Sequence, residues 1–143
     1  MKARGQRDGA TLVEAIAVLA VVAVASLIVV NRNAYSRADL AAEAVILRTH
    51  LRYVQAMAMA NNVATWQLAF QGDRYTLLKD NVGAPLPDEQ SDTHTLTPGV
   101  TVSSGMVRMN EWGTPNGGDF SVTLSDGKSS ETITMQGETG FVQ

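Results

Sequence analysis

The 143-residue sequence contains no cysteine. This absence excludes disulfide bonds and thiolate chemistry, so the compartment of the protein must be argued from other features. Glycine and proline are also absent between Ala10 and Asn61. Because these two residues are the usual interruptions of a helix, their absence permits one unbroken helix over this stretch.

Basic residues are scarce in the second half of the chain. After Asn62 there are ten acidic and four basic residues, an excess of six negative charges. The four basic residues are Arg74, Lys79, Arg108 and Lys128. An acidic surface repels phosphate backbones, so DNA is not an expected partner. A local patch of Arg48, Arg52 and Arg74 keeps DNA binding open as an alternative.

No set of residues with the spacing of a catalytic site is recognisable. No nucleophile accompanies His50 or His94 at a known spacing, and no glycine-rich phosphate loop opens a helix. Oxygen ligands for Ca²⁺ could come from Asp88, Glu89 and Asp92, but the ligand order of a calcium loop is missing. We therefore predict no enzymatic activity, no cofactor and no metal site, and interpret both histidines as structural or solvent-facing.

A long apolar run lies near the N-terminus. From Ala10 to Val30 the only polar residues are Thr11, Glu14 and Ser26. In a helix these residues would reach about 31 Å, which matches the hydrocarbon core of a bilayer. We therefore predict a transmembrane helix over residues 10–30. Because basic residues precede the run, the N-terminus is expected in the cytoplasm and the rest of the chain outside it.

The helix is expected to continue beyond the membrane. Apolar residues recur every three or four positions and form one stripe: Leu40, Ala44, Leu47, Leu51, Val54 and Ala58. Polar residues such as Glu43 and Arg48 fall mostly off the stripe. We predict one helix over residues 11–60, closed by Asn61 and Asn62, with residues 31–61 as its amphipathic part.

Residues 62–143 have the pattern of a β domain. Predicted strands cover residues 63–70, 74–79, 95–96, 100–102, 106–110, 120–124, 131–135 and 141–142. Two pairs of strands flank short turn sequences, at residues 71–73 and 125–130, and are predicted hairpins. Residues 80–93 and 111–119 are predicted loops. The alternation of apolar and polar residues predicts an antiparallel sheet with one face on the helix stripe.

The N-terminal residues resemble a known processing signal. Basic residues, Gly9, and then Thr11-Leu12-Val13-Glu14 at the head of an apolar helix are similar to the class III signal of type IV pilins and type II secretion pseudopilins. The resemblance implies that prepilin peptidase removes residues 1–9 by cutting between Gly9 and Ala10, and methylates Ala10. In this family the residue at the position of Ala10 is usually Phe or Met.

The resemblance also implies a role for Glu14. Cleavage creates an α-ammonium within the membrane boundary, and a buried ammonium needs a counter-charge. Glu14 of a neighbouring subunit can supply that charge, which would set the register of a helical filament. Alternatively, Glu14 is a carboxylate that reaches the headgroups at the cytoplasmic end of the helix.

The C-terminal part resembles one branch of this family. Met109-Asn110-Glu111-Trp112-Gly113-Thr114-Pro115, followed by a hairpin and Thr139-Gly140-Phe141-Val142, is similar to the GspH/FimT branch. That branch includes minor pseudopilins of type II secretion and minor pilins of type IV pili.

These observations lead to one expected architecture and function. The expected fold class is α+β, with a long N-terminal helix packed on a C-terminal antiparallel sheet. The expected function is that of a minor pilin-like subunit in a pseudopilus or pilus tip, anchored in the bacterial inner membrane with its C-terminal domain periplasmic or extracellular. Expected partners are prepilin peptidase, other pilin subunits, the assembly platform and secreted substrate. A DNA-binding minor pilin and a signal-anchored protein that never polymerises are the alternatives.

Overall fold

The computed structural model describes residues 12–61 and 63–143, and within the helix it leaves aside the side chains of residue 25 and residues 27–36. The predicted leader, residues 1–9, and Ala10 therefore lie outside the described residues. The chain forms two compact units, Met1–Tyr35 and Ser36–Gln143.

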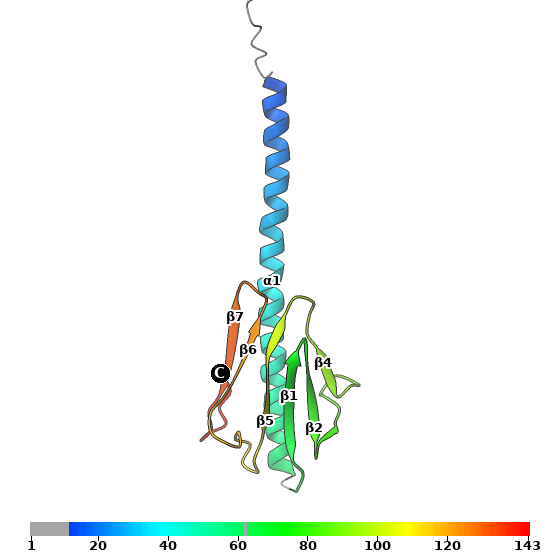
Figure 1. Ribbon diagram of the computed structural model, residues 1–143, viewed down its shortest axis with the longest axis vertical. Coiled ribbons are helices and arrows are strands. Elements are labelled where there is room, and N and C mark those ends of the chain that lie inside the picture. Colours follow the sequence, from blue (N-terminus) through cyan, green and yellow to red (C-terminus); the bar gives the residue numbers. More distant parts are fainter. Residues whose placement is uncertain (1–11, 62) are drawn as a thin grey trace, which may run out of the picture. The chain divides into compact units, whose positions relative to one another are not determined.

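The helix α1 covers Leu12–Ala60. It includes every described residue of the predicted helix and ends where predicted (Figure 1). Its end is fixed by Asn61, whose side-chain oxygen accepts hydrogen bonds from the backbone N–H groups of Val63 and Ala64, at 3.2 and 3.4 Å. A short polar side chain that bonds the following backbone competes with helix continuation, which explains why the chain turns here.

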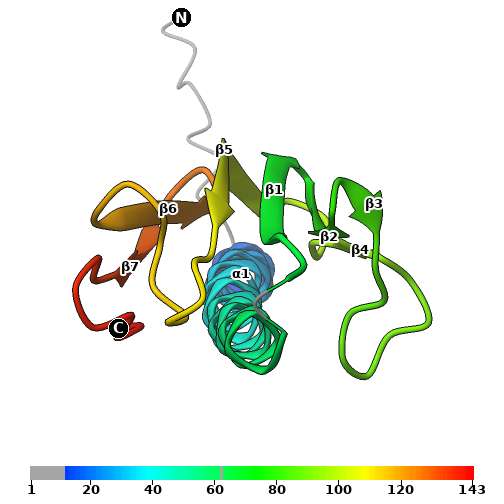
Figure 2. The same ribbon diagram turned by 90° about the horizontal axis from the view of Figure 1, so that it is seen from below.

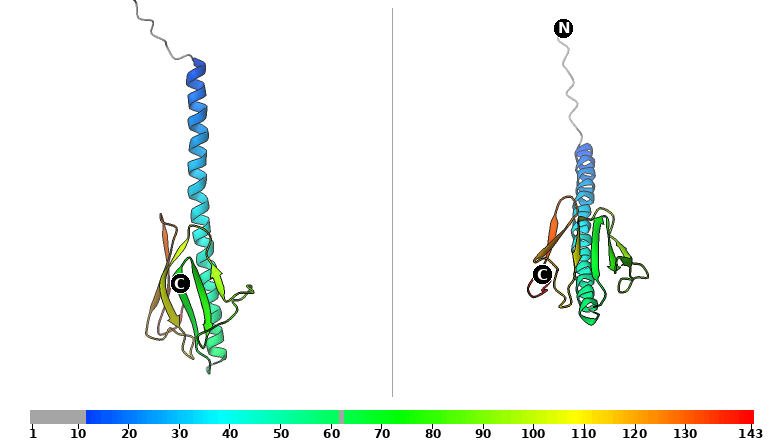
Figure 3. Two further views of the ribbon diagram at one scale, coloured as in Figure 1. Left: turned by 45° about the vertical axis from the view of Figure 1, so that its right-hand side comes forward. Right: turned by 60° about the horizontal axis from the view of Figure 1, so that its bottom comes forward.

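The unit Ser36–Gln143 contains an antiparallel sheet of seven strands. The strands are β1 (Trp66–Gly72), β2 (Arg74–Lys79), β3 (Val82–Gly83), β4 (Thr93–Thr95), β5 (Thr101–Arg108), β6 (Phe120–Ser125) and β7 (Ser130–Met135). Their order is β3-β2-β1-β5-β6-β7, and β4 also pairs with β2. Figure 3 shows the strands beside the second half of α1 in two further views. Every pairing is antiparallel, as the alternating pattern predicts.

The core lies between the sheet and the second half of α1. Viewed along the helix, the strands curve around one side of it, with β6 and β7 at one end and β2 to β4 at the other (Figure 2). All six residues of the predicted stripe, from Leu40 to Ala58, are buried. Leu68, Leu77 and Ile133 are among the buried residues that the strands contribute. The predicted packing of the sheet on this stripe is therefore confirmed.

Both predicted hairpins are present. Between β1 and β2, Gln71 pairs with Arg74, and Gly72 adopts a positive φ of 60° that tight hairpin turns require. Between β6 and β7, Ser125 pairs with Ser130 around a four-residue turn. The two hairpins predicted from the turn sequences are therefore confirmed.

Several strand predictions were wrong in detail: the strand predicted at 95–96 is β4 at Thr93–Thr95, and the one predicted at 141–142 is a single bridge between Val142 and Met135. The two strands predicted at 100–102 and 106–110 are one strand, β5, because Gly105 continues the pairing with Phe70 of β1. The first strand begins at Trp66 rather than Val63, after the turn at Asn61. The loop predicted at 80–93 contains β3, which follows a turn made by Asp80 and Asn81 at φ values of 52° and 65°.

Candidate functional site

Of the predicted processing and assembly residues, the structure describes Glu14. Gly9 and Ala10 are outside the described residues, so the cleavage site stays a prediction. Glu14 lies in the first turn of α1 and is exposed. A carboxylate in this position is favoured by the positive end of the helix dipole.

Apolar side chains surround Glu14 on α1. Eight large ones are each 56–79% exposed, namely Leu12, Val13, Ile16, Val18, Leu19, Val21, Val22 and Val24. These positions lie on every side of a helix, so the apolar side chains are not confined to one face. An isolated helix that is apolar all round exposes a large area that water disfavours, so this segment needs a cover of lipid or protein.

The transmembrane helix predicted at residues 10–30 stays a prediction. Among residues whose placement is described, no helix combines the length and the apolarity needed to cross a membrane. The predicted span at 10–30 includes Ala10, Thr11 and several side chains that lie outside that part of the chain.

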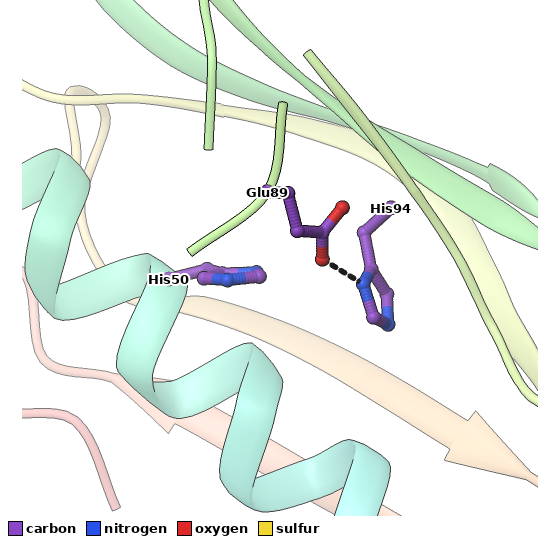
Figure 4. Close-up of side chains that lie close together, drawn as sticks. All are labelled: His50, Glu89 and His94. Carbon is purple, nitrogen blue, oxygen red and sulfur yellow. Dashed lines mark hydrogen bonds and ion pairs between the residues drawn. The ribbon is translucent and has the colours of Figure 1, made fainter. Parts of the chain in front are cut away.

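A second group of polar residues lies in the unit Ser36–Gln143. It contains both histidines of the chain, His50 from α1 and His94 from β4, together with Glu89 from the preceding loop (Figure 4). One ligand-type atom from each of these three residues lies within 4.8 Å of the other two. No spacing in the sequence relates the two histidines, whereas the structure brings them together with ring centroids 5.6 Å apart.

Each histidine also contacts a side chain outside this group of three. His50 Nδ1 lies 2.7 Å from the hydroxyl of Tyr75, which is fully buried on β2. His94 Nε2 donates to the carboxylate of Glu43 at 2.9 Å, and His94 Nδ1 hydrogen-bonds Glu89. His94 is therefore held between two carboxylates.

Glu43 connects the helix to the chain that follows β4. It is only 4% exposed, although the stripe pattern predicts a position off the buried face. Its other carboxylate oxygen accepts hydrogen bonds from the backbone N–H and the hydroxyl of Thr97, at 2.8 and 2.6 Å. The charge of Glu43 is thus compensated in the interior, as a buried carboxylate requires.

These contacts shift the pKa values of the group. Burial disfavours the charged form of both Glu43 and His94, but their hydrogen bonds outweigh it, so the pKa of Glu43 is lowered and that of His94 is raised. Burial and then the charge of His94 lower the pKa of His50. Burial, followed by the charges of Glu43 and Glu89, raises the pKa of Tyr75 far above its ordinary value, which keeps the phenol neutral.

One sequence signal could have identified this group. Glu43 and His50 are seven positions apart on α1, which places them on the same helix face beside Leu47. A carboxylate and an imidazole on the face that packs on the sheet require buried partners. No spacing in the sequence identifies Glu89 and His94 as those partners, because the conformation of the loop before β4 decides it.

Several side chains of the acidic cluster and of the arginine patch, both alternatives in the sequence, have partners of their own. Of the three acids considered for Ca²⁺, Glu89 faces His94, whereas Asp92 accepts a hydrogen bond from the hydroxyl of Thr93. In the proposed arginine patch, Arg48 binds Glu131 at 2.7 Å and Arg74 binds Asp73 at 2.9 Å. Two of those three positive charges are therefore neutralised by neighbouring carboxylates, which weakens the case for a phosphate-binding surface.

Comparison with known proteins identifies the fold. No protein-family model and no curated protein sequence matches the chain. Among solved structures, the type IV minor pilin FimU of Pseudomonas aeruginosa is similar, with a TM-score of 0.57 and 16% sequence identity. The match covers 75% of this chain and 88% of that chain. At this identity the likeness shows the fold alone, and the chain therefore has a pilin-like α+β fold.

Proposed function

We propose that this protein is a minor pilin-like structural subunit that enters a filament through the N-terminal part of α1. The observation that carries the proposal is the ring of exposed apolar side chains from Leu12 to Val24, interrupted by Glu14. In a filament, the corresponding helices of neighbouring subunits would cover these side chains. The likeness of the fold to a minor pilin supports this reading.

The proposed route to assembly begins with processing. Prepilin peptidase would cut after Gly9 and methylate Ala10, as the resemblance of residues 1–14 implies. Before assembly, residues 10–30 would hold the protein in the inner membrane, with the sheet domain on the far side. The 21-residue apolar run in the sequence supports this placement.

Glu14 would then control entry into the filament. The new α-ammonium of an incoming subunit lies at the head of an apolar helix, where an unpaired charge is strongly unfavourable. Glu14 of a subunit already in the filament would neutralise this α-ammonium and fix the axial position of the incoming subunit. In this scheme the sheet domain covers the filament surface and meets neighbouring subunits or secreted substrate, and the protein has a structural rather than a catalytic role.

The test compares variants of Glu14 in the cells that make the protein. Glu14→Val should leave membrane insertion intact and reduce the amount of protein in sheared filaments at least tenfold. Glu138→Gln, which removes an exposed carboxylate close to the C-terminus, is the matched control and should assemble normally. Wild-type amounts of Glu14→Val in filaments would contradict the charge-pair role.

A further inference from the structure

The group of His50, Glu89 and His94 has the composition of a metal-binding site. Its members come from three separate segments, α1, the loop before β4, and β4 itself. Figure 4 shows Glu89 between the two imidazole rings. Tetrahedral ligands of a zinc-sized ion lie about 3.4 Å apart. The three ligand atoms already lie within 4.8 Å of one another. To shorten the longest of these three distances to about 3.4 Å, each of the two side chains would move by less than about 1 Å.

The residues behind the histidines orient the rings for coordination. His94 Nε2 donates to Glu43, so an ion that displaced the proton from Nδ1 would bind there and replace the hydrogen bond with Glu89. His50 Nδ1 lies beside the Tyr75 hydroxyl, so Nε2 would be its coordinating nitrogen, and an ion would compete with the hydrogen bond that the ring makes with the backbone of Pro87. A metal-binding histidine almost always donates its second ring N–H to a carboxylate or another oxygen. Buried Glu43 accepts from His94 in this way, and the buried Tyr75 hydroxyl can accept from His50 when the proton is on Nδ1.

The charges of the group fit a divalent cation. Glu43 and Glu89 bring two negative charges to a region where His50, Tyr75 and Glu43 are buried. A doubly charged ion between neutral imidazoles would balance both carboxylates, which is the condition for burying charge at low cost. The Glu89 and His94 side chains are 28% and 13% exposed, so the position is reachable from solvent.

We propose that His50, Glu89 and His94 bind a divalent transition-metal ion of the zinc type, with Glu43 and Tyr75 holding the two imidazoles. Two nitrogen ligands and one carboxylate suit Zn²⁺ and not Ca²⁺, which takes six to eight oxygens. Three protein ligands leave a fourth position for water or for a group from a partner. By joining α1 to the loop before β4, the ion would stabilise this edge of the sheet domain. The proposal does not depend on the assembly role.

The test uses the full chain, purified in detergent without a polyhistidine tag and stripped of metal with a chelator. Zn²⁺ is titrated by calorimetry, and Co²⁺ is added separately because its visible absorption reports tetrahedral coordination. The variants are Glu89→Gln and His94→Gln, which each remove a ligand, and Glu43→Gln, which removes the orienting carboxylate. Asp88→Asn is the matched control because it removes the same charge from the neighbouring position. Circular dichroism verifies that each variant is folded.

We expect the wild type and Asp88→Asn to bind one Zn²⁺ per chain with affinities within about twofold of each other. Glu89→Gln and His94→Gln should bind at least tenfold more weakly and lose the tetrahedral Co²⁺ spectrum. Glu43→Gln should bind roughly 10–100-fold more weakly, the loss typical of an orienting partner. The proposal is wrong if the wild type binds no Zn²⁺ in this stoichiometry. Equal affinity of Glu89→Gln and Asp88→Asn, with both variants folded by circular dichroism, would also overturn it.

Discussion

At the scale of single residues, Gly140 shows how close packing selects glycine. It has a φ of 69°, and a β-carbon there would lie 2.7 Å from Gln55 Nε2 and 2.8 Å from the carbonyl oxygen of Gly113. Gln55 Nε2 donates to the carbonyls of both Gly113 and Gly140. The Gln55 side chain thus attaches α1 to the C-terminal segment, and only a residue without a side chain leaves room for it.

Substitution of this glycine tests the attachment. Gly140→Ala should lower the free energy of unfolding by about 2–4 kcal/mol, from the positive φ and from displacement of Gln55 together. Gly127→Ala is the control, because Gly127 also has a positive φ of 81° but a methyl group added there would have no neighbouring atom within 4 Å. Gly127→Ala should lower the free energy of unfolding by about 1–2 kcal/mol, because only the positive φ is unfavourable there. Equal losses in urea denaturation would show that the Gln55 contact contributes nothing.

Glu43 provides a second prediction, on pH. Because its pKa in the folded protein is lowered, its stabilising contribution is present above its ordinary pKa of 4.5 and is lost as the pH falls through the folded value. In metal-free protein at pH 7, Glu43→Gln should therefore lower the free energy of unfolding by about 1–3 kcal/mol. The difference from wild type should shrink below pH 4.5.

The control for Glu43 is Asp39→Asn, one helical turn earlier on α1, which should change the free energy of unfolding by less than about 0.5 kcal/mol. The role of the ionised carboxylate would be contradicted if the difference in unfolding free energy between Glu43→Gln and wild type stayed constant from pH 7 down to acid unfolding.

At the scale of elements, the second half of α1 supplies one side of the core. Leu51 lies at the centre of the stripe and is fully buried, whereas Val45 on the same helix is 60% exposed. Leu51→Ala should lower the free energy of unfolding by about 2–5 kcal/mol through lost contacts and a cavity. Val45→Ala should change it by less than about 0.5 kcal/mol. Chemical denaturation of both variants measures the difference, and similar values would mean that the stripe does not form the core.

The elements also show what the sequence can predict. The continuity of α1 follows from the absence of glycine and proline, its end follows from Asn61, and both hairpins follow from their turn residues. These signals lie within short stretches of the chain, so they can be recognised from the sequence before the fold is known. The continuity of β5 could not, because residues 103–105 contain no apolar side chain and become strand only by pairing with β1.

The polar group around His94 was missed for a similar reason. Its members approach one another only after the sheet has packed on α1 and the chain has turned at Asp88, whose φ is 62°. The helix contributes Glu43 and His50 in a pattern that is visible in the sequence. The position of Glu89 depends on a loop conformation for which the sequence carries no periodic signal.

At the scale of the whole molecule, the two units differ in what covers their apolar residues. In Ser36–Gln143 the helix stripe is covered by the protein's own sheet. In the other unit, the described apolar side chains of α1 are exposed, including Leu19 at 67%. We expect lipid to cover them first and neighbouring subunits to cover them later, after the leader has been removed.

The mass of the chain recovered from the sheared filament fraction of the cells that make it tests this account most directly. The expected result is a chain in that fraction whose mass corresponds to residues 10–143 with a methylated amino group on Ala10. A chain that keeps Met1 and is found only in the membrane fraction, with none in filaments, would contradict it.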